Sequence, residues 1–232
     1  MLAGGKSSRM GQNKALLPVG GIPVIERLIR ELEGVAAEIL IAGGSQPEAY
    51  RHLGKDVISD VFPGLGPLAG LHAGLQAAST SWSLAVACDM PFANRDVFQW
   101  LAEQALLAEK NQKDQKEGAI SSAAGSVISS KHGEGTANSG LEAIIPVVQG
   151  QVQPLLALYR RSVLPGLERE LQAGNLKLTR WTETLRAEYV NGSALAAAAG
   201  MPQERIPFNM NHPRDYRQAL DWLDASTDKG MS

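Results

Sequence analysis

The chain has 232 residues, of which 44% are hydrophobic and 20% are charged. These proportions exclude a wholly disordered or fibrous chain, and the length allows one large α/β domain or two small ones. The formal net charge of −2 argues against broad binding to nucleic acid, because such binding needs a basic surface. An anionic ligand would therefore need a local group of cations.

Cysteine content and hydropathy indicate the compartment. Cys88 is the only cysteine, which excludes an intramolecular disulfide and a cysteine-rich zinc site and fits a reducing cytoplasm. No stretch reaches the roughly 20 apolar residues that span a bilayer. The first ten residues carry Gly4, Lys6 and Arg9 where a signal peptide has an apolar core. We therefore expect a cytoplasmic protein without a membrane partner.

Short strand-like runs alternate with longer helical patterns, which predicts a sheet covered by crossover helices. Helices are expected to begin near Pro23, to span about 68–78 and 96–109, to begin again near Ser162, and to open finally at Pro213. Strands are expected over 39–41, 57–58, 84–88, 141–148 and 152–159. The last two flank Gln149-Gly150, which predicts a hairpin.

Residues from about Asn111 to Gly140 interrupt this rhythm. They are rich in Gly, Ser, Lys, Glu and Gln and contain no aromatic residue. Such a segment buries too little apolar surface to offset the ordering of the chain, so we interpret it as a flexible insertion at about 111–140. A compact subdomain and a linker between two domains are the alternatives.

The opening LAGGKSSRMGQNKALL is the most informative segment. Its glycines allow the backbone to approach an anion and to direct successive N–H groups at it. Arg9 and Lys14 add positive charge to the same loop. The pattern is neither the phosphate loop of the common NTPases nor the dinucleotide fingerprint. We interpret it as a triphosphate-binding loop.

This segment closely resembles the signature of the molybdenum cofactor guanylyltransferase family. That resemblance implies that Leu2, Ala3, Gly4 and Gly5 contact the guanine nucleotide of GTP. It also implies that Lys14 holds the phosphates. Related sugar and cytidine nucleotidyltransferases have a similar loop, but more often carry an alanine at the position of Gly4.

A second match is SLAVACDMPF, in which a buried strand delivers Asp89 to its carboxyl end, where open α/β sheets bind ligands. One carboxylate is enough for Mg²⁺, because phosphate oxygens and water complete its coordination. The resemblance makes Asp89 the metal ligand. Cys88 beside it lies in an apolar strand without a His or Asn partner nearby, so we expect a packed thiol.

Two further segments resemble the family. Asp60, in SDVFPGLGPLAGLHAGL, corresponds to a guanine-nucleotide contact. Its carboxylate suits the N1 and amino donors of guanine, and contact with the ribose is the alternative. Within the same segment we expect His72 to be a packing or surface residue. Near the carboxyl end, PFNMNHPRDY places Asn209 and Asn211 beside the pterin substrate, by resemblance.

Two positions depart from the family. Ala42 stands where a strand-end asparagine often binds the nucleotide, and His212 replaces the usual threonine. The resemblance therefore carries phosphate binding more directly than guanine selection. The match otherwise covers most of the chain outside the insertion, including Pro154, Tyr159 and Arg160 in QPLLALYRR.

The resemblance implies a Rossmann-like nucleotidyltransferase fold, with a central, mostly parallel mixed sheet flanked by helices on both faces. We expect one domain over 1–232 that transfers GMP from GTP to the molybdenum-molybdopterin cofactor. Lys14, Arg9 and Asp89 would act catalytically with Mg²⁺. Transient contact with cofactor delivery proteins or target enzymes is a further expectation.

The alternatives are cytidylyl transfer to the same cofactor, other NTP transfer such as sugar-nucleotide synthesis, and a nucleotide-binding regulatory module without catalysis. The last reading draws on the abrupt start, since only three residues precede Gly4. If the first strand is truncated, the loop loses its anchor, and the chain would bind nucleotide weakly or be unstable.

Overall fold

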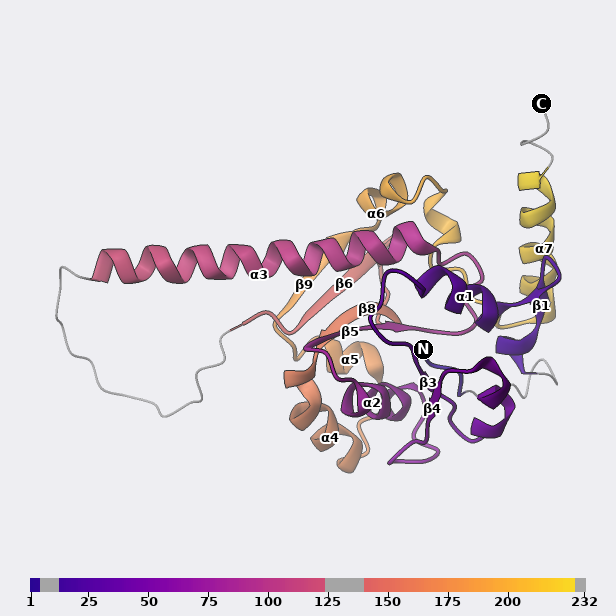
Figure 1. Cartoon of the computed structure of the whole chain (residues 1–232), viewed down its shortest axis with the longest axis horizontal. Coiled ribbons are helices and arrows are strands. Elements are labelled where there is room, and N and C mark those ends of the chain that lie inside the picture. Colours follow the sequence, from indigo (N-terminus) through magenta and orange to yellow (C-terminus); the bar gives the residue numbers. More distant parts are fainter. Residues whose placement is uncertain (5–12, 124–139, 228–232) are drawn as a thin grey trace.

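The computed structural model describes residues 1–4, 13–123 and 140–227. Figure 1 shows a twisted sheet with helices on both sides. The helices are α1 (Val24–Leu32), α2 (Pro67–Ala77), α3 (Arg95–Ala123), α4 (Leu164–Gln172), α5 (Leu178–Thr182), α6 (Gly192–Ala198) and α7 (Pro213–Thr227). The strands are β1 (Pro18–Val19), β2 (Ile22–Pro23), β3 (Leu40–Ala42), β4 (Asp56–Ile58), β5 (Trp82–Val86), β6 (Ala143–Val148), β7 (Gln151–Val152), β8 (Leu156–Arg160) and β9 (Ala187–Asn191).

Leu2 links the two halves of the central sheet. It forms parallel bridges to Ala42 at the end of β3 and to Ala87 just after β5. On one side of Leu2, β3 pairs in parallel with β4. On the other side, β5 pairs antiparallel with β8, β8 antiparallel with β6, and β6 in parallel with β9. The expected mixed α/β sheet is confirmed.

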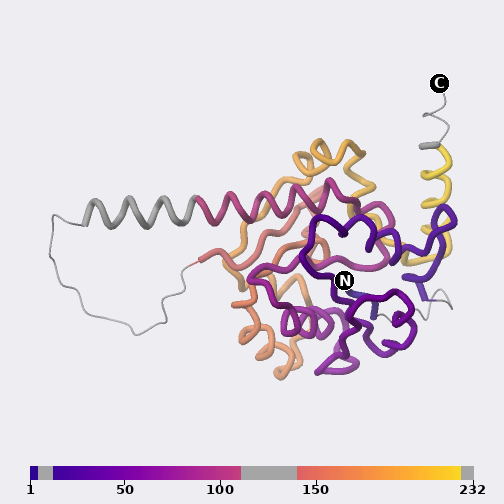
Figure 2. Tube along the Cα trace, viewed as in Figure 1, coloured from indigo at the N-terminus to yellow at the C-terminus, as the bar shows by residue number. Residues whose placement is uncertain are grey.

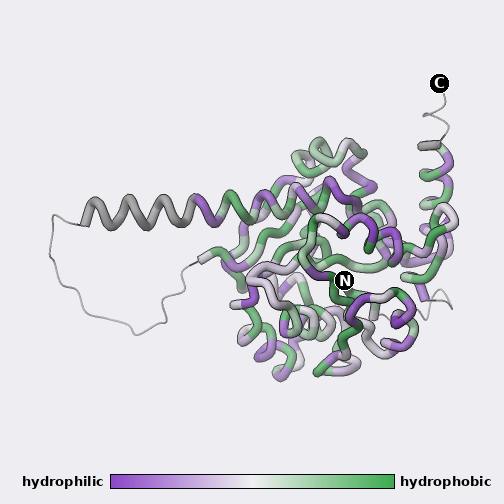
Figure 3. The backbone as a smooth tube through the Cα atoms, in the orientation of Figure 1, coloured by the Kyte–Doolittle hydropathy of each residue, from purple (hydrophilic) through white to green (hydrophobic). Residues whose placement is uncertain are grey.

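Both faces of the sheet are covered at its central strands, which explains why β6 and β8 are apolar at nearly every position. On β6, Ala143 and Ile145 pack in one buried cluster with residues of α2 and α4, whereas Ile144 packs in another with residues of α3 and α6. Figure 3 shows the hydrophobic backbone segments concentrated in the strands between the helices. Successive residues of β6 thus face opposite helical layers.

The hairpin predicted at Gln149-Gly150 is confirmed, because β6 and β7 flank it and pair in antiparallel register. Both turn residues have positive φ, 50° and 76°, as a tight two-residue turn requires. The strand expected over 152–159 is divided into β7 and β8. Between them, the N–H of Leu156 donates to the carbonyl of Gln153 (3.1 Å) and closes a turn.

The insertion expected from Asn111 begins too early in our prediction, because α3 continues to Ala123. Gln, Lys and Glu are good helix formers, so a segment without core residues can still be helical. Figure 1 shows α3 projecting well past the sheet. Residues 124–139 lie outside the described residues, and the single domain over 1–232 stays a prediction. No helix within the described ranges is long and apolar enough to cross a membrane.

The amino-terminal segment lies within the central sheet, whereas α7 packs beside β1, outside it. Figure 2 shows the amino terminus in the middle of the molecule and α7 at its edge, beside β1. The hydroxyl of Tyr216 on α7 donates to the carbonyl of Pro18 (2.6 Å). This hydrogen bond ties the first turns of α7 to β1.

Candidate active site

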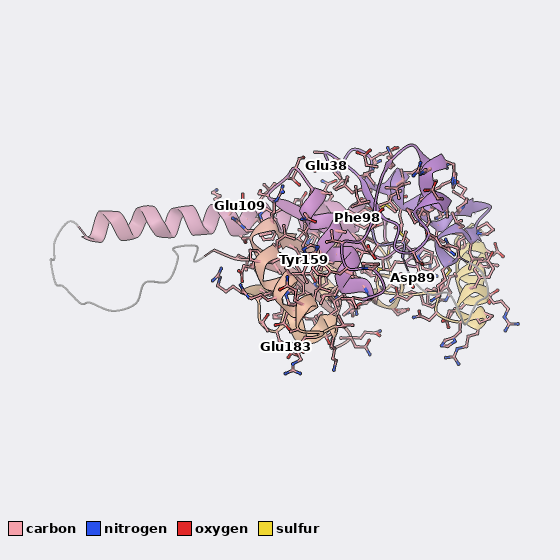
Figure 4. All side chains as sticks on the ribbon, turned by 90° about the horizontal axis from the view of Figure 1, so that it is seen from below. Glu38, Asp89, Phe98, Glu109, Tyr159 and Glu183 are labelled. Atoms are coloured by element: carbon pink, nitrogen blue, oxygen red, sulfur yellow. The ribbon has the colours of Figure 1, made fainter. Side chains whose placement is uncertain are left out.

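A cavity of about 180 Å³ lies at the carboxyl ends of the central strands. Its lining includes Leu2, Ala3, Gly4, Lys14 and Asp89, so the two motifs singled out in the sequence share one space. Figure 4 shows Asp89 in the part of the molecule nearest α7. This is the edge at which open α/β sheets bind ligands.

Backbone hydrogen bonds to both neighbouring strands hold the opening segment. The N–H of Leu2 donates to the carbonyl of Val86 (2.8 Å), and the N–H of Ala3 donates to the carbonyl of Ala42 (2.9 Å). The N–H of Ala42 donates in turn to the carbonyl of Met1 (2.8 Å), so both backbone groups of Ala42 are bonded to the opening segment. The start of the glycine-rich loop is therefore fixed by the sheet.

Gly4 packs backbone to backbone against Gly44. A Cβ atom on Gly4 would lie 2.5 Å from the Cα of Gly44 and 2.8 Å from its nitrogen. Gly44 itself has a φ of 57°, which favours glycine. The segments that follow Leu2 and β3 approach this closely only because neither carries a side chain here.

Lys14 is positioned by a short hydrogen-bonded chain. It begins a 3₁₀ turn whose cap is Asn13, and the amide oxygen of Asn13 accepts from the N–H of Ala15 (3.1 Å). The amide nitrogen of Asn13 donates to the hydroxyl of buried Tyr50 (2.8 Å), which donates to the carbonyl of Ala3 (2.7 Å). Our sequence analysis missed Asn13 and Tyr50. The cap position of Asn13 was a usable signal, but nothing in the sequence marked Tyr50.

Lys14 joins three segments that are far apart in the sequence. Its Nζ donates to Oδ1 of Asn211 (2.8 Å) and lies 3.7 Å from Oδ2 of Asp89. The side chains of Lys14 and Asp89 are 19% and 24% exposed, so solvent screens this pair only partly. A cation, a carboxylate and an amide therefore meet at the mouth of the cavity.

Asp89 lies in a poorly solvated position. Burial raises the pKa of its carboxyl, and the neighbouring Lys14 opposes that shift without cancelling it. No cluster of three His, Cys, Asp or Glu side chains able to hold a metal occurs in the described part of the chain. A lone carboxylate beside a cavity fits Mg²⁺, which keeps several water ligands and takes others from a phosphate substrate.

The loop before α7 is held in place by Asp215. Its Oδ2 accepts hydrogen bonds from the N–H groups of Asn211 (2.9 Å) and His212 (2.7 Å). An acidic residue in the first turn that reaches back to the helix start is a capping arrangement. The N–H of Met210 donates to the carbonyl of Asp89 (3.1 Å), which ties this loop to the end of β5. Asp215 was missed in the sequence, although its spacing from His212 is that of a capping box.

Asn209 differs from Asn211 in its contacts. Its amide nitrogen donates to the carbonyl of Pro207 (3.0 Å), within its own loop. The structure therefore brings Asn211 to Lys14, while Asn209 stabilises the backbone nearby.

Asp60 follows β4 and lies close to the opening segment. A Cβ on Gly70 would contact Leu2, Ala42 and Oδ1 of Asp60, at 3.5, 3.6 and 3.9 Å. Oδ1 of Asp60 is buried and has no hydrogen-bond partner among the described residues, and burial raises the pKa of this carboxyl. A buried acceptor without a donor is costly, so it is suited to receive donors from a ligand.

Four residues from the sequence analysis remain to be placed: Gly5, Arg9, Cys88 and His72. Gly5 and Arg9 lie outside the described residues. Cys88 is buried, and burial raises the pKa of its thiol to about 12, so the expectation of a packed, unreactive side chain is confirmed. His72 is buried on α2 and meets Phe62 edge to face, with ring centroids 5.2 Å apart, which confirms a packing residue.

Comparison with known proteins identifies relatives of this chain. Residues 1–190 match the MobA-like NTP transferase domain. The probable molybdenum cofactor guanylyltransferase of Carboxydothermus hydrogenoformans is 30% identical over 95% of this chain and 93% of its own length. The protein of the same description from Pelotomaculum thermopropionicum is 34% identical over 94% of this chain and 89% of its own.

Solved structures show the same fold. Molybdopterin-guanine dinucleotide biosynthesis protein A from Archaeoglobus fulgidus superimposes with a TM-score of 0.71, at 23% identity over 97% of both chains. The 2-C-methyl-D-erythritol 4-phosphate cytidylyltransferase from Thermus thermophilus has a TM-score of 0.55 at 18% identity, over 91% of this chain and 94% of its own. Together with the match over residues 1–190, these findings establish that the chain belongs to the MobA-like NTP transferase family.

Proposed function

We propose that this protein transfers GMP from GTP to the terminal phosphate of the molybdenum-molybdopterin cofactor. The observation that carries the proposal is the meeting of Lys14, Asp89 and Asn211 at the mouth of a cavity floored by the backbone of Leu2 to Gly4. Two relatives of matching length described as probable molybdenum cofactor guanylyltransferases support the choice of both substrates.

The reaction is an in-line displacement at the α-phosphorus of GTP. A phosphate oxygen of molybdopterin forms the new P–O bond, the bond from the α-phosphorus to the bridging oxygen breaks, and pyrophosphate leaves with that electron pair. No covalent enzyme intermediate is needed. The protein has to position two anions that repel each other and to stabilise the charge that develops at the phosphates.

Lys14 supplies positive charge for the triphosphate, and the backbone of Leu2 to Gly4 lets the phosphates approach closely. Arg9 is proposed to add a second cation. Asp89 would hold Mg²⁺, which neutralises charge on the phosphate oxygens when it is bound. Asn211 keeps Lys14 in the cavity, and the loop of Asn209 and Asn211 is the proposed neighbour of the pterin.

Asp60 is the proposed guanine-selecting residue. Its buried oxygen without a partner suits the N1 and amino donors of guanine, which cytosine does not present in the same arrangement. Asp60→Asn should therefore lower the preference for GTP over CTP while retaining pyrophosphate release. An unchanged preference would show that Asp60 does not recognise the base.

The direct test is to incubate the protein with Mg²⁺, molybdenum-molybdopterin and either GTP or CTP, and to measure pyrophosphate together with the dinucleotide product. We expect GTP to be preferred at least about tenfold, since a site built around specific hydrogen bonds rejects a base that lacks them. A preference for CTP would indicate the cytidylyl reaction. Binding of GTP without product would indicate a regulatory module.

A matched pair of lysine variants tests the assigned cation. Lys14→Gln should lower kcat/KM by at least about tenfold, because it removes a charge-assisted hydrogen bond to the phosphates. Lys55→Gln is the control, since Lys55 pairs with Glu33 at 2.9 Å on another part of the surface. Equal activity of the two variants would reject the role of Lys14.

A further inference from the structure

Lys14 contacts the same carboxylate that is proposed to bind a divalent cation. Its Nζ lies 3.7 Å from Oδ2 of Asp89, and the two side chains are only 19% and 24% exposed. Asp89 lies on the side of the molecule that carries α7 (Figure 4). Because little water surrounds the pair, each charge acts strongly on the other. The lysine ammonium and a metal ion are thus alternative partners for one largely buried carboxylate.

The described residues offer a free cation little besides Asp89. They contain no group of three His, Cys, Asp or Glu side chains that could hold a metal. A divalent ion on Asp89 would lie about 2.1 Å from a carboxylate oxygen, and therefore close to the ammonium of Lys14. Even with the screening typical of protein surfaces, the repulsion between two such cations is several times the thermal energy. Lys14 in this position therefore disfavours a metal ion that arrives alone.

Asn211 allows Lys14 to release Asp89 without leaving the site. The lysine Nζ donates to Oδ1 of Asn211 over 2.8 Å, which is the shorter of its two contacts. An ammonium has three donors, so Lys14 can keep Asn211 and exchange Asp89 for a phosphate oxygen. Ala3, Gly4 and Lys14 line one cavity, so a triphosphate bound to the backbone of this loop also meets the ammonium.

We propose that this site takes a divalent cation only together with a triphosphate, and that Lys14 enforces this pairing. The inference deepens the proposed function and rests on it. Without a triphosphate, Lys14 neutralises Asp89 and excludes the metal. A triphosphate attracts Lys14 to its own charges, and Asp89 then becomes available as a ligand. By thermodynamic linkage, the metal and the triphosphate raise each other's affinity by the same factor.

Mn²⁺ binding to the protein without nucleotide tests the exclusion directly, since Mn²⁺ accepts the same oxygen ligands as Mg²⁺. The variant is Lys14→Met, because methionine is unbranched and uncharged and brings no oxygen that could itself bind the metal. The dissociation constant for Mn²⁺, measured by electron paramagnetic resonance at pH 8, should fall at least about tenfold relative to the parent. Lys14→Arg keeps the positive charge and should bind Mn²⁺ as weakly as the parent.

Two controls locate the effect at this site. Asp89→Asn, added to Lys14→Met, should remove the gain in Mn²⁺ affinity, because the carboxylate is lost. Lys55→Met makes the same change beside another carboxylate, since Lys55 lies 2.9 Å from Glu33. Those two side chains are 28% and 53% exposed, so water screens them more effectively and the Mn²⁺ affinity should stay close to that of the parent.

The affinity for nucleotide should change in the opposite direction in the same variant. GTP affinity, measured by calorimetry without divalent cations, should fall at least about tenfold in Lys14→Met, because the phosphates lose a charge-assisted contact. A variant that merely folds less well would bind both ligands more weakly. Tighter Mn²⁺ binding together with weaker GTP binding therefore identifies competition between Lys14 and the metal.

Three results would overturn the inference. Equal Mn²⁺ affinities of the parent and Lys14→Met would show that Lys14 does not exclude the metal. A gain that persists after Asp89→Asn would place the metal elsewhere, and an equal gain in Lys55→Met would reduce the effect to net charge.

The measurements also separate this inference from the transferase reaction. Product formation by the parent, with unchanged Mn²⁺ affinity in Lys14→Met, would retain the reaction and reject the exclusion of the metal. The expected Mn²⁺ affinities in a protein that forms no product would reject the reaction and retain the competition between Lys14 and the metal.

Discussion

Replacing Gly4 with alanine should both destabilise the protein and impair its proposed reaction. The new Cβ would lie 2.5 Å from the Cα of Gly44, whereas carbon atoms in contact are about 3.5 to 4.0 Å apart. The two backbone segments must therefore separate by roughly 1 Å. No flexible side chain is available to move instead, because both partners are backbone.

The expected cost of this separation is about 1 to 3 kcal/mol, which is typical of overpacking. For a chain of this length it corresponds to a fall in Tm of about 2 to 12 °C, at about 2 to 4 °C per kcal/mol. A displacement of about 1 Å in a substrate-binding loop can lower turnover about a hundredfold. Thermal unfolding and GTP-dependent pyrophosphate release measure the two effects.

Gly74→Ala is the matched control, because its Cβ meets nothing within 4 Å and alanine favours a helix. We expect this variant to keep its activity and to be slightly more stable than the parent. If Gly4→Ala had the same Tm and activity as Gly74→Ala, the close approach of Gly4 and Gly44 would not constrain the site.

Three further predictions concern the charged groups. Asp89→Asn should increase the free energy of unfolding at pH 8. The pKa of Asp89 is raised in the folded state, so its ionised form destabilises the fold at pH values above the usual aspartate pKa. The extra stability of the asparagine variant should therefore shrink as the pH falls toward about 4. Urea unfolding at several pH values measures this, and an asparagine variant no more stable at pH 8 would contradict it. In the pH profile of kcat/KM, the acid limb should lie at a higher pH than the usual aspartate pKa. Because Lys14 lowers the pKa of Asp89, the limb should move to still higher pH in Lys14→Gln. A limb at the same pH in both proteins would show that the two groups are not coupled. Asp215→Ala should lower the free energy of unfolding by about 1 to 3 kcal/mol and reduce activity, because Asp215 holds the loop before α7. Asp221→Ala, at an exposed position of the same helix, should change neither. Equal losses in both variants would show that Asp215 does not hold this loop.

The sequence was most informative where residue type and local pattern carry the chemistry. The glycine-rich opening, Lys14 and Asp89 were identified from their own segments, and a sheet covered by crossover helices followed from alternating apolar runs. The structure confirms that these segments share one cavity. Their roles in binding and catalysis stay predictions.

Other features depend on contacts that no local pattern reports. Lys14 and Asn211 are separated by 197 positions, and tertiary contacts such as the bond from Met210 to Asp89 and the packing of α7 beside β1 bring them together. The place of Tyr50 beneath Asn13 and Ala3 likewise depends on tertiary packing. The end of α3 was misjudged because a composition unable to form a core does not prevent an exposed helix.

The central claim is that Lys14 and Asp89 act on the same triphosphate. The most direct measurement is a double-mutant cycle on GTP affinity by calorimetry in the presence of Mg²⁺, with Lys14→Gln, Asp89→Asn and the combined variant. We predict that each single change weakens binding and that the combined loss differs clearly from the sum of the two, because the groups lie 3.7 Å apart and share a ligand. Strictly additive losses, or GTP affinity unchanged in both single variants, would contradict the account.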